Sequence, residues 1–173
     1  MHTIRKLTAE EGLDLLPQLV ALLQDSVCHG ASVGFTLPLT NEVAERFWHD
    51  IFREVGNGNR ALLAVSQNDA VVGSVQLALC TRPNGLHRAE VQKLFVHTSC
   101  RRQGIATALM NAIEREARYA RRTLLYLDTE PAKPAAKMYE QMGWNLVGEI
   151  PDYASTPDGD LHGTAIFYRK LQR

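Results

Sequence analysis

The stretch that decides the fold is Val91-Gln-Lys-Leu-Phe-Val-His-Thr-Ser-Cys-Arg-Arg-Gln-Gly-Ile-Ala-Thr-Ala-Leu-Met-Asn-Ala-Ile-Glu114. It opens with β-branched and aromatic residues, which favour a pleated strand. From Ile105 onward, apolar residues recur at positions 105, 108, 109, 112 and 113. This period is typical of one face of an amphipathic helix. The stretch therefore predicts a strand, a tight basic turn and a long helix.

The turn in this stretch is a candidate anion-binding site. The first backbone N–H groups of a helix have no partner within the helix and lie at the positive end of its dipole. Gly104, where the turn becomes the helix, would let an anion approach these groups closely. Arg101 and Arg102 add positive charge on the same side. The alternative is an ordinary solvated helix edge, and neither the Walker nor the dinucleotide-binding glycine pattern is present.

Length and composition favour one globular domain over residues 1–173. Nineteen basic and nineteen acidic side chains give no net charge, so nothing indicates nucleic acid or a membrane surface as a partner. Three cysteines without a close pair favour a reducing compartment. The chain shows no signal-peptide pattern and no run long enough to span a membrane. We expect a cytoplasmic protein, as a monomer or homodimer.

The remaining chain alternates between strand and helix patterns. Thr8-Ala-Glu-Glu11 is a capping box that opens the first helix, and Pro17 is expected to split that helix. Further helices are expected to begin near Asn41, at Ile105 and at Pro134. Strands are predicted at residues 3–7, 60–66, 70–80, 90–96, 123–127, 144–150 and 164–171, with loops at 30–35 and 151–159. The resulting order is β-α-α-β-β-β-α-β-α-β-β.

Arg101-Arg-Gln-Gly-Ile-Ala106 resembles the pyrophosphate loop of the GCN5-related N-acetyltransferase (GNAT) superfamily, and the element order resembles its fold. The resemblance implies an α/β (α+β) protein whose mixed, mostly antiparallel sheet is splayed between its fourth and fifth strands and flanked by helices. It also implies an acetyl-CoA-dependent N-acetyltransferase, with acetyl-CoA as cosubstrate. The cofactor-binding residues it implies are Leu94, Phe95, Val96, Arg101, Arg102, Gln103, Gly104, Ile105, Ala106 and Thr107.

Acetyl transfer from a thioester to an amine requires a neutral amine, although a free alkylamine has a pKa of about 10. A base that accepts its proton is therefore useful. Glu90 begins one strand that should border the splay, and Asp128 ends the next, where ligands bind in such sheets. The pair could accept the proton directly or through a water molecule. Alternatively, Glu90 lies on a solvated strand face and Asp128 forms a turn.

Met138-Tyr-Glu-Gln-Met-Gly-Trp144 resembles the GNAT stretch whose tyrosine is often the general acid, so the resemblance assigns that role to Tyr139. The alternative is a core tyrosine whose hydroxyl reaches the surface.

A narrower resemblance, to the tabtoxin-resistance branch of the superfamily, is spread over 30–35, 83–94, 127–130 and 156–166. That branch acetylates the free amine of a small β-lactam toxin, and its water-assisted acid and base carboxylates correspond to Glu90 and Asp128. It implies a small-molecule amine as substrate.

The loops at 30–35 and 151–159 are expected to flank the acceptor. Candidate substrate-binding residues on or near them are Ser32, Phe35, Asp152, Tyr153 and His162. No histidine spacing resembles a metal site, so no metal is expected. Two alternatives remain: a protein or peptide N-acetyltransferase, and a non-catalytic acyl-CoA-binding sensor. A closed pocket between the two loops would count against the peptide alternative.

Overall fold

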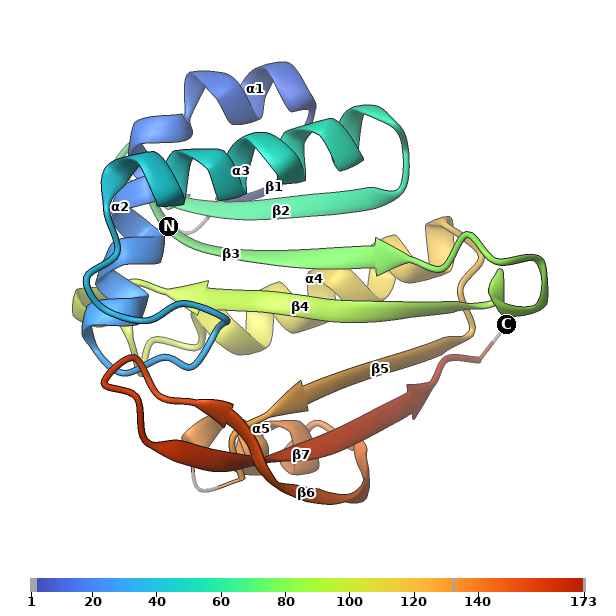
Figure 1. Ribbon diagram of the computed structural model, residues 1–173. Helices are drawn as coiled ribbons and strands as arrows, with labels where there is room; N and C mark the ends of the chain where they lie inside the picture. Colours follow the sequence, from blue (N-terminus) through green and yellow to red (C-terminus); the bar gives the residue numbers. More distant parts are fainter. Residues whose placement is uncertain (1–2, 132, 173) are drawn as a thin grey trace.

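Over residues 3–131 and 133–172, which the computed structural model describes, seven strands form one sheet in the order β1-β2-β3-β4-β5-β7-β6 (Figure 1). Only β4 and β5 are parallel neighbours in this described part. The predicted mixed, mostly antiparallel sheet is therefore confirmed. The strands are β1 (Thr3–Leu7), β2 (Arg60–Gln67), β3 (Ala70–Leu79), β4 (Arg88–Val96), β5 (Leu124–Thr129), β6 (Asn145–Ser155) and β7 (Leu161–Lys170).

The helices begin where local chemistry predicted. The Thr8 hydroxyl accepts a hydrogen bond from Glu11 N, and the Glu11 carboxylate accepts one from Thr8 N, which confirms the capping box. Pro17 falls in the first turn of the second helix, where its missing N–H is not needed. The first helical segment is therefore split into two helices, as expected. The helices are α1 (Ala9–Asp14), α2 (Leu16–Cys28), α3 (Asn41–Gly56), α4 (Ile105–Tyr119) and α5 (Pro134–Gln141).

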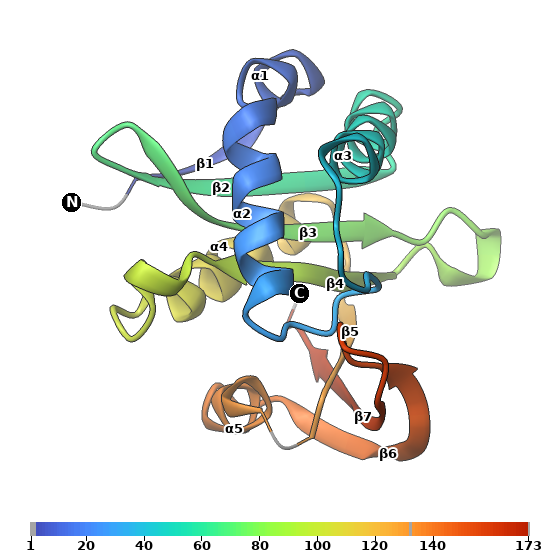
Figure 2. The same cartoon turned by 60° about the vertical axis from the view of Figure 1, so that its left-hand side comes forward.

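Both faces of the sheet are covered by helices (Figure 2). On one face α4 and α5 bury an apolar cluster that includes Leu109 and Phe167. On the other face α2 and α3 bury a second cluster around Trp48 and Leu62. Fully burying one large apolar side chain contributes about 1.5–3 kcal/mol. The two clusters therefore hold the sheet between two layers of helices.

The parallel strands β4 and β5 pair over only three residues. The pairing runs from Arg88 opposite Leu124 to Glu90 opposite Tyr126. Beyond Glu90, β4 continues against β3 as far as Val96, whereas β5 continues against β7 (Figure 1). Backbone groups of β4 that face this gap have no strand partner in the part of the chain that the structure describes. The predicted splay between the fourth and fifth strands is confirmed.

A bulge in β4 determines on which face of the sheet the side chains of this strand lie. The register with β3 shifts between Ser74 and Gln76, and Lys93 has φ of 52°. An extra residue in a strand moves the following side chains to the opposite face. Val91 accordingly packs against α4, whereas Phe95 packs on the α2–α3 face. Strict alternation would have placed both on one face.

The hairpin of β6 and β7 is longer than the sequence indicated. The loop expected at 151–159 is wrong over residues 151–155, which belong to β6, and β7 already begins at Leu161. Pro151 and Asp152 fall in an irregularity between Ile150 and Ala154, where Asp152 has φ of 50°. Because β6 is an edge strand with one unpaired side, it tolerates a proline.

Candidate active site

The turn before α4 forms the candidate donor side. Gly104 caps α4 with φ of 77°, and no side chain caps the helix. A Cβ built on Gly104 would meet no atom within 4 Å, so the N–H groups of the first turn are open to a ligand. The side chains of Arg101, Arg102 and Gln103 are exposed beside them. Open N–H groups and nearby cations fit the pyrophosphate of acetyl-CoA.

The other predicted cofactor residues lie along the same path. Phe95 is only 1% exposed in the core, so its backbone alone could meet a ligand. Leu94 and Val96 are half-buried on the α4 side of the splay. Ile105, Ala106 and Thr107 form the first turn of α4. Backbone groups that could meet a ligand are therefore present both at the gap and at this helix end.

Glu90 lies where β4 and β5 part. Its parallel neighbour Tyr126 donates a hydrogen bond from its hydroxyl to Glu90 Oε2 at 3.3 Å. Burial raises the pKa of Tyr126, and the charge of Glu90 raises it further. The hydroxyl therefore stays protonated and keeps Glu90 oriented. Tyr126 was not among the sequence candidates, because the parallel register that pairs it with Glu90 is a tertiary property.

Asp128 lies on β5 at the open end of the splay and is exposed. The hydroxyl of Thr164, a residue only 2% exposed, donates to Asp128 Oδ2 at 2.9 Å and also lies 3.2 Å from Thr129 O. A buried hydroxyl on β7 thus fixes the orientation of the carboxylate. Thr164 was not among the candidate site residues, because it lies 36 residues from Asp128 and reaches it only through strand pairing.

Tyr139 projects from α5 into the apolar cluster. Its ring packs against Trp144 and Phe167, with centroids 6.0 and 5.9 Å apart. Burial raises the pKa of Tyr139 well above its usual range, and the nearby charge of Asp128 raises it further. The hydroxyl is therefore protonated at neutral pH, which suits a proton donor and not a base.

Lys93 is a charged residue of this region that sequence reasoning missed. Its Nζ donates a hydrogen bond to Val33 O, and a Cβ built on Gly34 would lie 3.5 Å from Nζ. Burial lowers the pKa of Lys93, whereas the charges of Asp128 and Glu90 oppose that shift. One signal was available in the sequence. In a regular strand Val91, Lys93 and Phe95 would share one buried face, and a charged lysine is unexpected on such a face.

On the candidate acceptor side, the 30–35 loop lies beside the β6–β7 hairpin and contacts it (Figure 2). Ser32 Oγ lies 2.6 Å from His162 Nε2 and donates to Ser155 O at 3.2 Å. Leu37 N donates to Pro157 O at 2.9 Å. We call these three contacts the acceptor latch. The latch joins segments more than a hundred residues apart and brings together two predicted residues, Ser32 and His162.

The other predicted acceptor residues lie outside the latch. Phe35 is half-buried, packs edge-on against Phe47 at 5.3 Å and lies against the α2–α3 core. Asp152 and Tyr153 are exposed on the edge strand β6. The candidate acceptor residues are therefore not gathered at one point.

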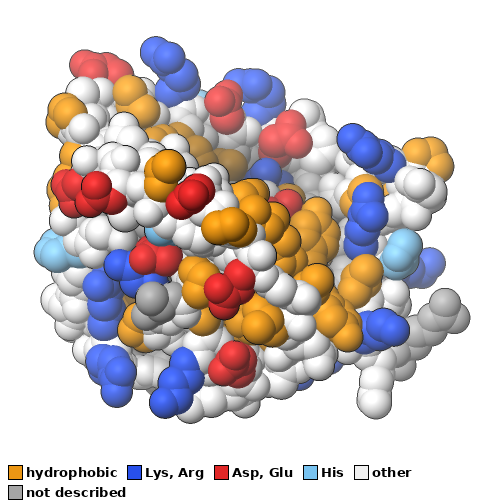
Figure 3. Space-filling model, turned by 60° about the horizontal axis from the view of Figure 1, so that its bottom comes forward, with side chains coloured by type: hydrophobic (Ala, Val, Ile, Leu, Met, Phe, Trp, Pro, Cys, Tyr) orange, Lys and Arg blue, Asp and Glu red, His pale blue; other side chains and the backbone are white. Residues whose placement is uncertain are grey.

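Viewed from below, the molecule has a hollow that contains charged side chains and is bordered by apolar ones (Figure 3).

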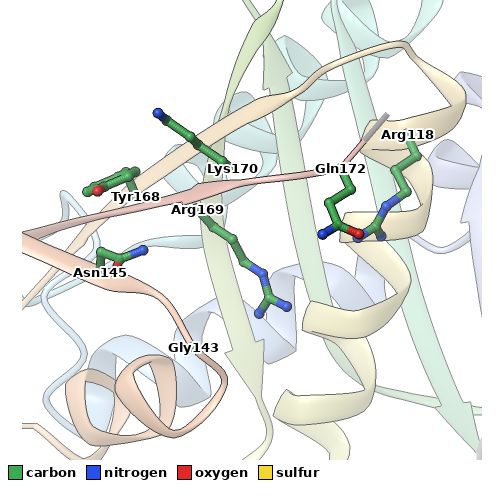
Figure 4. A pocket seen from close by; sticks show the side chains of 7 residues that line it. All are labelled: Arg118, Gly143, Asn145, Tyr168, Arg169, Lys170 and Gln172. Atoms are coloured by element: carbon green, nitrogen blue, oxygen red, sulfur yellow. The ribbon is translucent and has the colours of Figure 1, made fainter.

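A separate cavity of about 410 Å³ opens near the end of β7 (Figure 4). Tyr168 and Lys170 point to one side of the strand and Arg169 to the other. Arg169 pairs with Glu114 Oε1 at 3.1 Å, so its charge is already matched. No predicted site residue lines the cavity, which is formed by Arg118, Gly143, Asn145, Tyr168, Arg169, Lys170 and Gln172.

Residues 3–131 and 133–172 contain neither a metal-binding cluster nor a membrane-spanning helix. No group of three or more His, Cys, Asp or Glu in this part is arranged to hold a metal ion. None of its helices is long and apolar enough to cross a membrane.

Known proteins resemble this chain in sequence and in structure. The model of the acetyltransferase (GNAT) family matches residues 27–144. An uncharacterized N-acetyltransferase from the hisH–hisA intergenic region of Azospirillum brasilense is 32% identical over 116 residues, which is 65% of this chain and 67% of that protein.

Two solved structures share the fold over nearly the whole chain. An N-acetyltransferase from Staphylococcus aureus Mu50 has a TM-score of 0.81 and 18% identity over 99% of both chains. YncA from Salmonella typhimurium, solved with its cofactor acetyl-CoA, has a TM-score of 0.78 and 14% identity over 100% of this chain and 95% of that one. At these identities the structures support the fold alone.

Proposed function

Because the chain belongs to the GNAT family and is thus an acetyl-CoA-dependent N-acetyltransferase, we propose that it acetylates the amine of a small, amino-acid-like molecule. A β-lactam amino acid of the tabtoxin type is the first candidate. The observation that carries the proposal is the acceptor latch. Its contacts tie Ser32 and Leu37 to the β6–β7 hairpin, and two loops tied together in this way favour a small acceptor over an extended peptide.

On the donor side, Arg101–Thr107 hold the phosphates and the backbone of Leu94–Val96 holds the pantetheine arm. This assignment is supported by the open first turn of α4 and by the unpaired edge of β4. Acetyl-CoA supplies the acetyl group as a thioester, with CoA as the leaving group. The protein has to position the acceptor amine in line with the thioester, which can itself contribute roughly 7–11 kcal/mol.

Glu90 and Asp128 are the proposed bases for the proton of the amine, acting directly or through a water molecule. Their orientation supports this role, because Tyr126 and Thr164 each hold one carboxylate by a hydroxyl. A positioned general base typically contributes 10²–10⁴-fold. Direct attack of the neutral amine then breaks the C–S bond without a covalent enzyme intermediate.

Tyr139 is the proposed acid. As the C–S bond breaks, its hydroxyl donates to the sulfur and stabilises the departing thiolate. At neutral pH the hydroxyl carries its proton, so it can donate a hydrogen bond to the negative charge that develops on the sulfur.

A CoA-release screen tests the proposal. The protein is incubated with acetyl-CoA and a panel of β-lactam amino acids, free amino acids, simple amines and short peptides. We expect release of CoA with small amino acids and none above background with peptides. Release with peptides alone would favour the peptide alternative. Tight CoA binding without turnover of any acceptor would favour the acyl-CoA sensor.

A further inference from the structure

We propose that Lys93 is a specificity-determining residue, whose ammonium binds an anionic group of the acceptor while Glu90 and Asp128 face the acceptor amine. The inference rests on the proposed function, because it adds a residue to the acceptor side of that reaction. The inference specifies that the acceptor carries an anionic group in addition to its amine. The two carboxylates alone account only for the amine.

The β4 bulge places this ammonium at the acceptor side. Because the register shifts at the bulge, the side chain of Lys93 leaves the α4 face and its Nζ reaches the carbonyl of Val33 in the 30–35 loop. The neighbouring residue Ser32 takes part in the acceptor latch. The side chain of Lys93 therefore reaches from β4, the strand that also carries Glu90, to the 30–35 loop on the acceptor side.

Among the residues that the structure describes, the ammonium retains N–H donors without a hydrogen-bond partner. A lysine has three N–H donors, and one of them is bonded to Val33 O. Within the described residues, no carboxylate lies within 4.0 Å of Lys93 Nζ. Burial of a cation is costly unless it is paired and hydrogen-bonded. An anionic group on the acceptor would provide the missing partner.

Both signs of charge surround Lys93, which fits a zwitterionic acceptor. Glu90 on β4 and Asp128 on β5 are the acidic groups that act on Lys93, and Arg60 on β2 is the basic one. A molecule with an ammonium and a carboxylate can place its ammonium against the acids and its carboxylate against Lys93. An amine without an acidic group leaves the Lys93 charge unmatched, and charge-assisted hydrogen bonds are the stronger ones.

The competing explanation is purely structural: Lys93 only fastens the 30–35 loop through Val33. The two explanations differ in one measurable respect. A loop fastener affects all acceptors by the same factor, whereas an anion-binding residue affects only those with an anionic group. Matched acceptors that differ only in a carboxylate therefore separate them.

The experiment measures kcat/KM by CoA release for three pairs: tyrosine with tyramine, tryptophan with tryptamine, and leucine with 3-methylbutylamine. The variants are Lys93→Gln, which keeps a donor for Val33, and Lys93→Arg, which keeps the charge. Lys170→Met removes an exposed charge at the far end of β7 and serves as the control. Thermal unfolding and the KM for acetyl-CoA show that each variant is folded and binds the donor.

We expect the wild-type protein to prefer the amino acid of each pair. Lys93→Gln should lower kcat/KM for the amino acids on the order of 10- to 100-fold, the value of one charged hydrogen bond, and leave the amines nearly unchanged. Lys93→Arg should restore much of the preference, and Lys170→Met should retain all of it.

Equal losses for both members of each pair, or a wild-type preference for the amines, would overturn the role of Lys93 and leave the small-acceptor function standing. No turnover of any small acceptor, together with turnover of peptides, would overturn the proposed function, and the Lys93 inference would fall with it.

Discussion

The candidate donor side and the candidate acceptor side of this protein are built in different ways. The donor side is a single run of chain, from β4 through the basic turn into α4, and it presents mainly backbone groups. The acceptor side combines the 30–35 loop, β5 and the β6–β7 hairpin, and it presents side chains. A local backbone motif can be recognised from a short pattern, whereas a site built from distant side chains depends on the fold.

The difference also predicts how each side responds to substitution. Changes on the acceptor side should alter turnover and acceptor specificity while acetyl-CoA binding is retained. Changes in the basic turn should alter acetyl-CoA affinity first. Four predictions test this separation.

The largest effect is expected from the carboxylates. Glu90→Gln and Asp128→Asn should each lower kcat by about 10²–10⁴-fold, because each removes a candidate base. The dissociation constant for acetyl-CoA, measured by calorimetry, should stay within about threefold. Glu45→Gln, at an exposed position of α3, is the matched control. Full activity of both site variants with an authentic acceptor would rule out the base assignment.

Tyr139→Phe should lower kcat by about 10²-fold, the lower end for a general acid, with little change in acceptor KM. It should also change stability at alkaline pH. Since the pKa of Tyr139 is raised in the folded state, the folded protein retains a proton that the unfolded chain loses above about pH 10. The free energy of unfolding should therefore fall as pH rises above that value.

The phenylalanine variant lacks this contribution, so its unfolding curve should fall less steeply above about pH 10. Chemical denaturation of both proteins at a series of alkaline pH values provides the measurement. A steeper loss of stability in the variant would contradict the buried, protonated hydroxyl.

Gly104→Ala should weaken acetyl-CoA binding by about tenfold. A left-handed conformation costs a non-glycine residue roughly 1–2 kcal/mol, and the new methyl group narrows the approach to the first turn of α4. Gly58→Ala is the control: Gly58 has φ of 74° and equally open surroundings but lies at the end of α3, away from the turn. Both variants should lose similar stability, and only Gly104→Ala should lose affinity.

The smallest effect is expected from the acceptor latch. Ser32→Ala removes the contacts to His162 and Ser155, and a hydrogen bond contributes about 0.5–1.5 kcal/mol. The acceptor KM should therefore rise roughly 2- to 10-fold, with acetyl-CoA KM unchanged. Thr40→Ala, which removes the N-cap of α3, should lower stability without this change in KM. An equal rise in both KM values for Ser32→Ala would contradict the separation of the two sides.

Much of the fold could be predicted because its signals are local. The capping box at Thr8–Glu11 and the break at Pro17 each depend on a few adjacent residues. The extension of β6 through Pro151 could not be read from sequence, because a proline and a left-handed Asp152 resemble a loop. Pairing with β7 outweighed those local preferences.

The candidate site divides in the same way. The sequence by itself determined the turn of the candidate donor side, because a glycine at a helix start and neighbouring arginines form a local motif that favours anions. It also named Glu90 and Asp128 by their places at strand ends. Only the tertiary structure decided what surrounds them: Tyr126 by parallel register, Thr164 through β7, and Lys93 through the bulge. The physical reason is that local conformation follows from neighbouring residues, whereas the face and partners of a side chain follow from register and packing between distant segments.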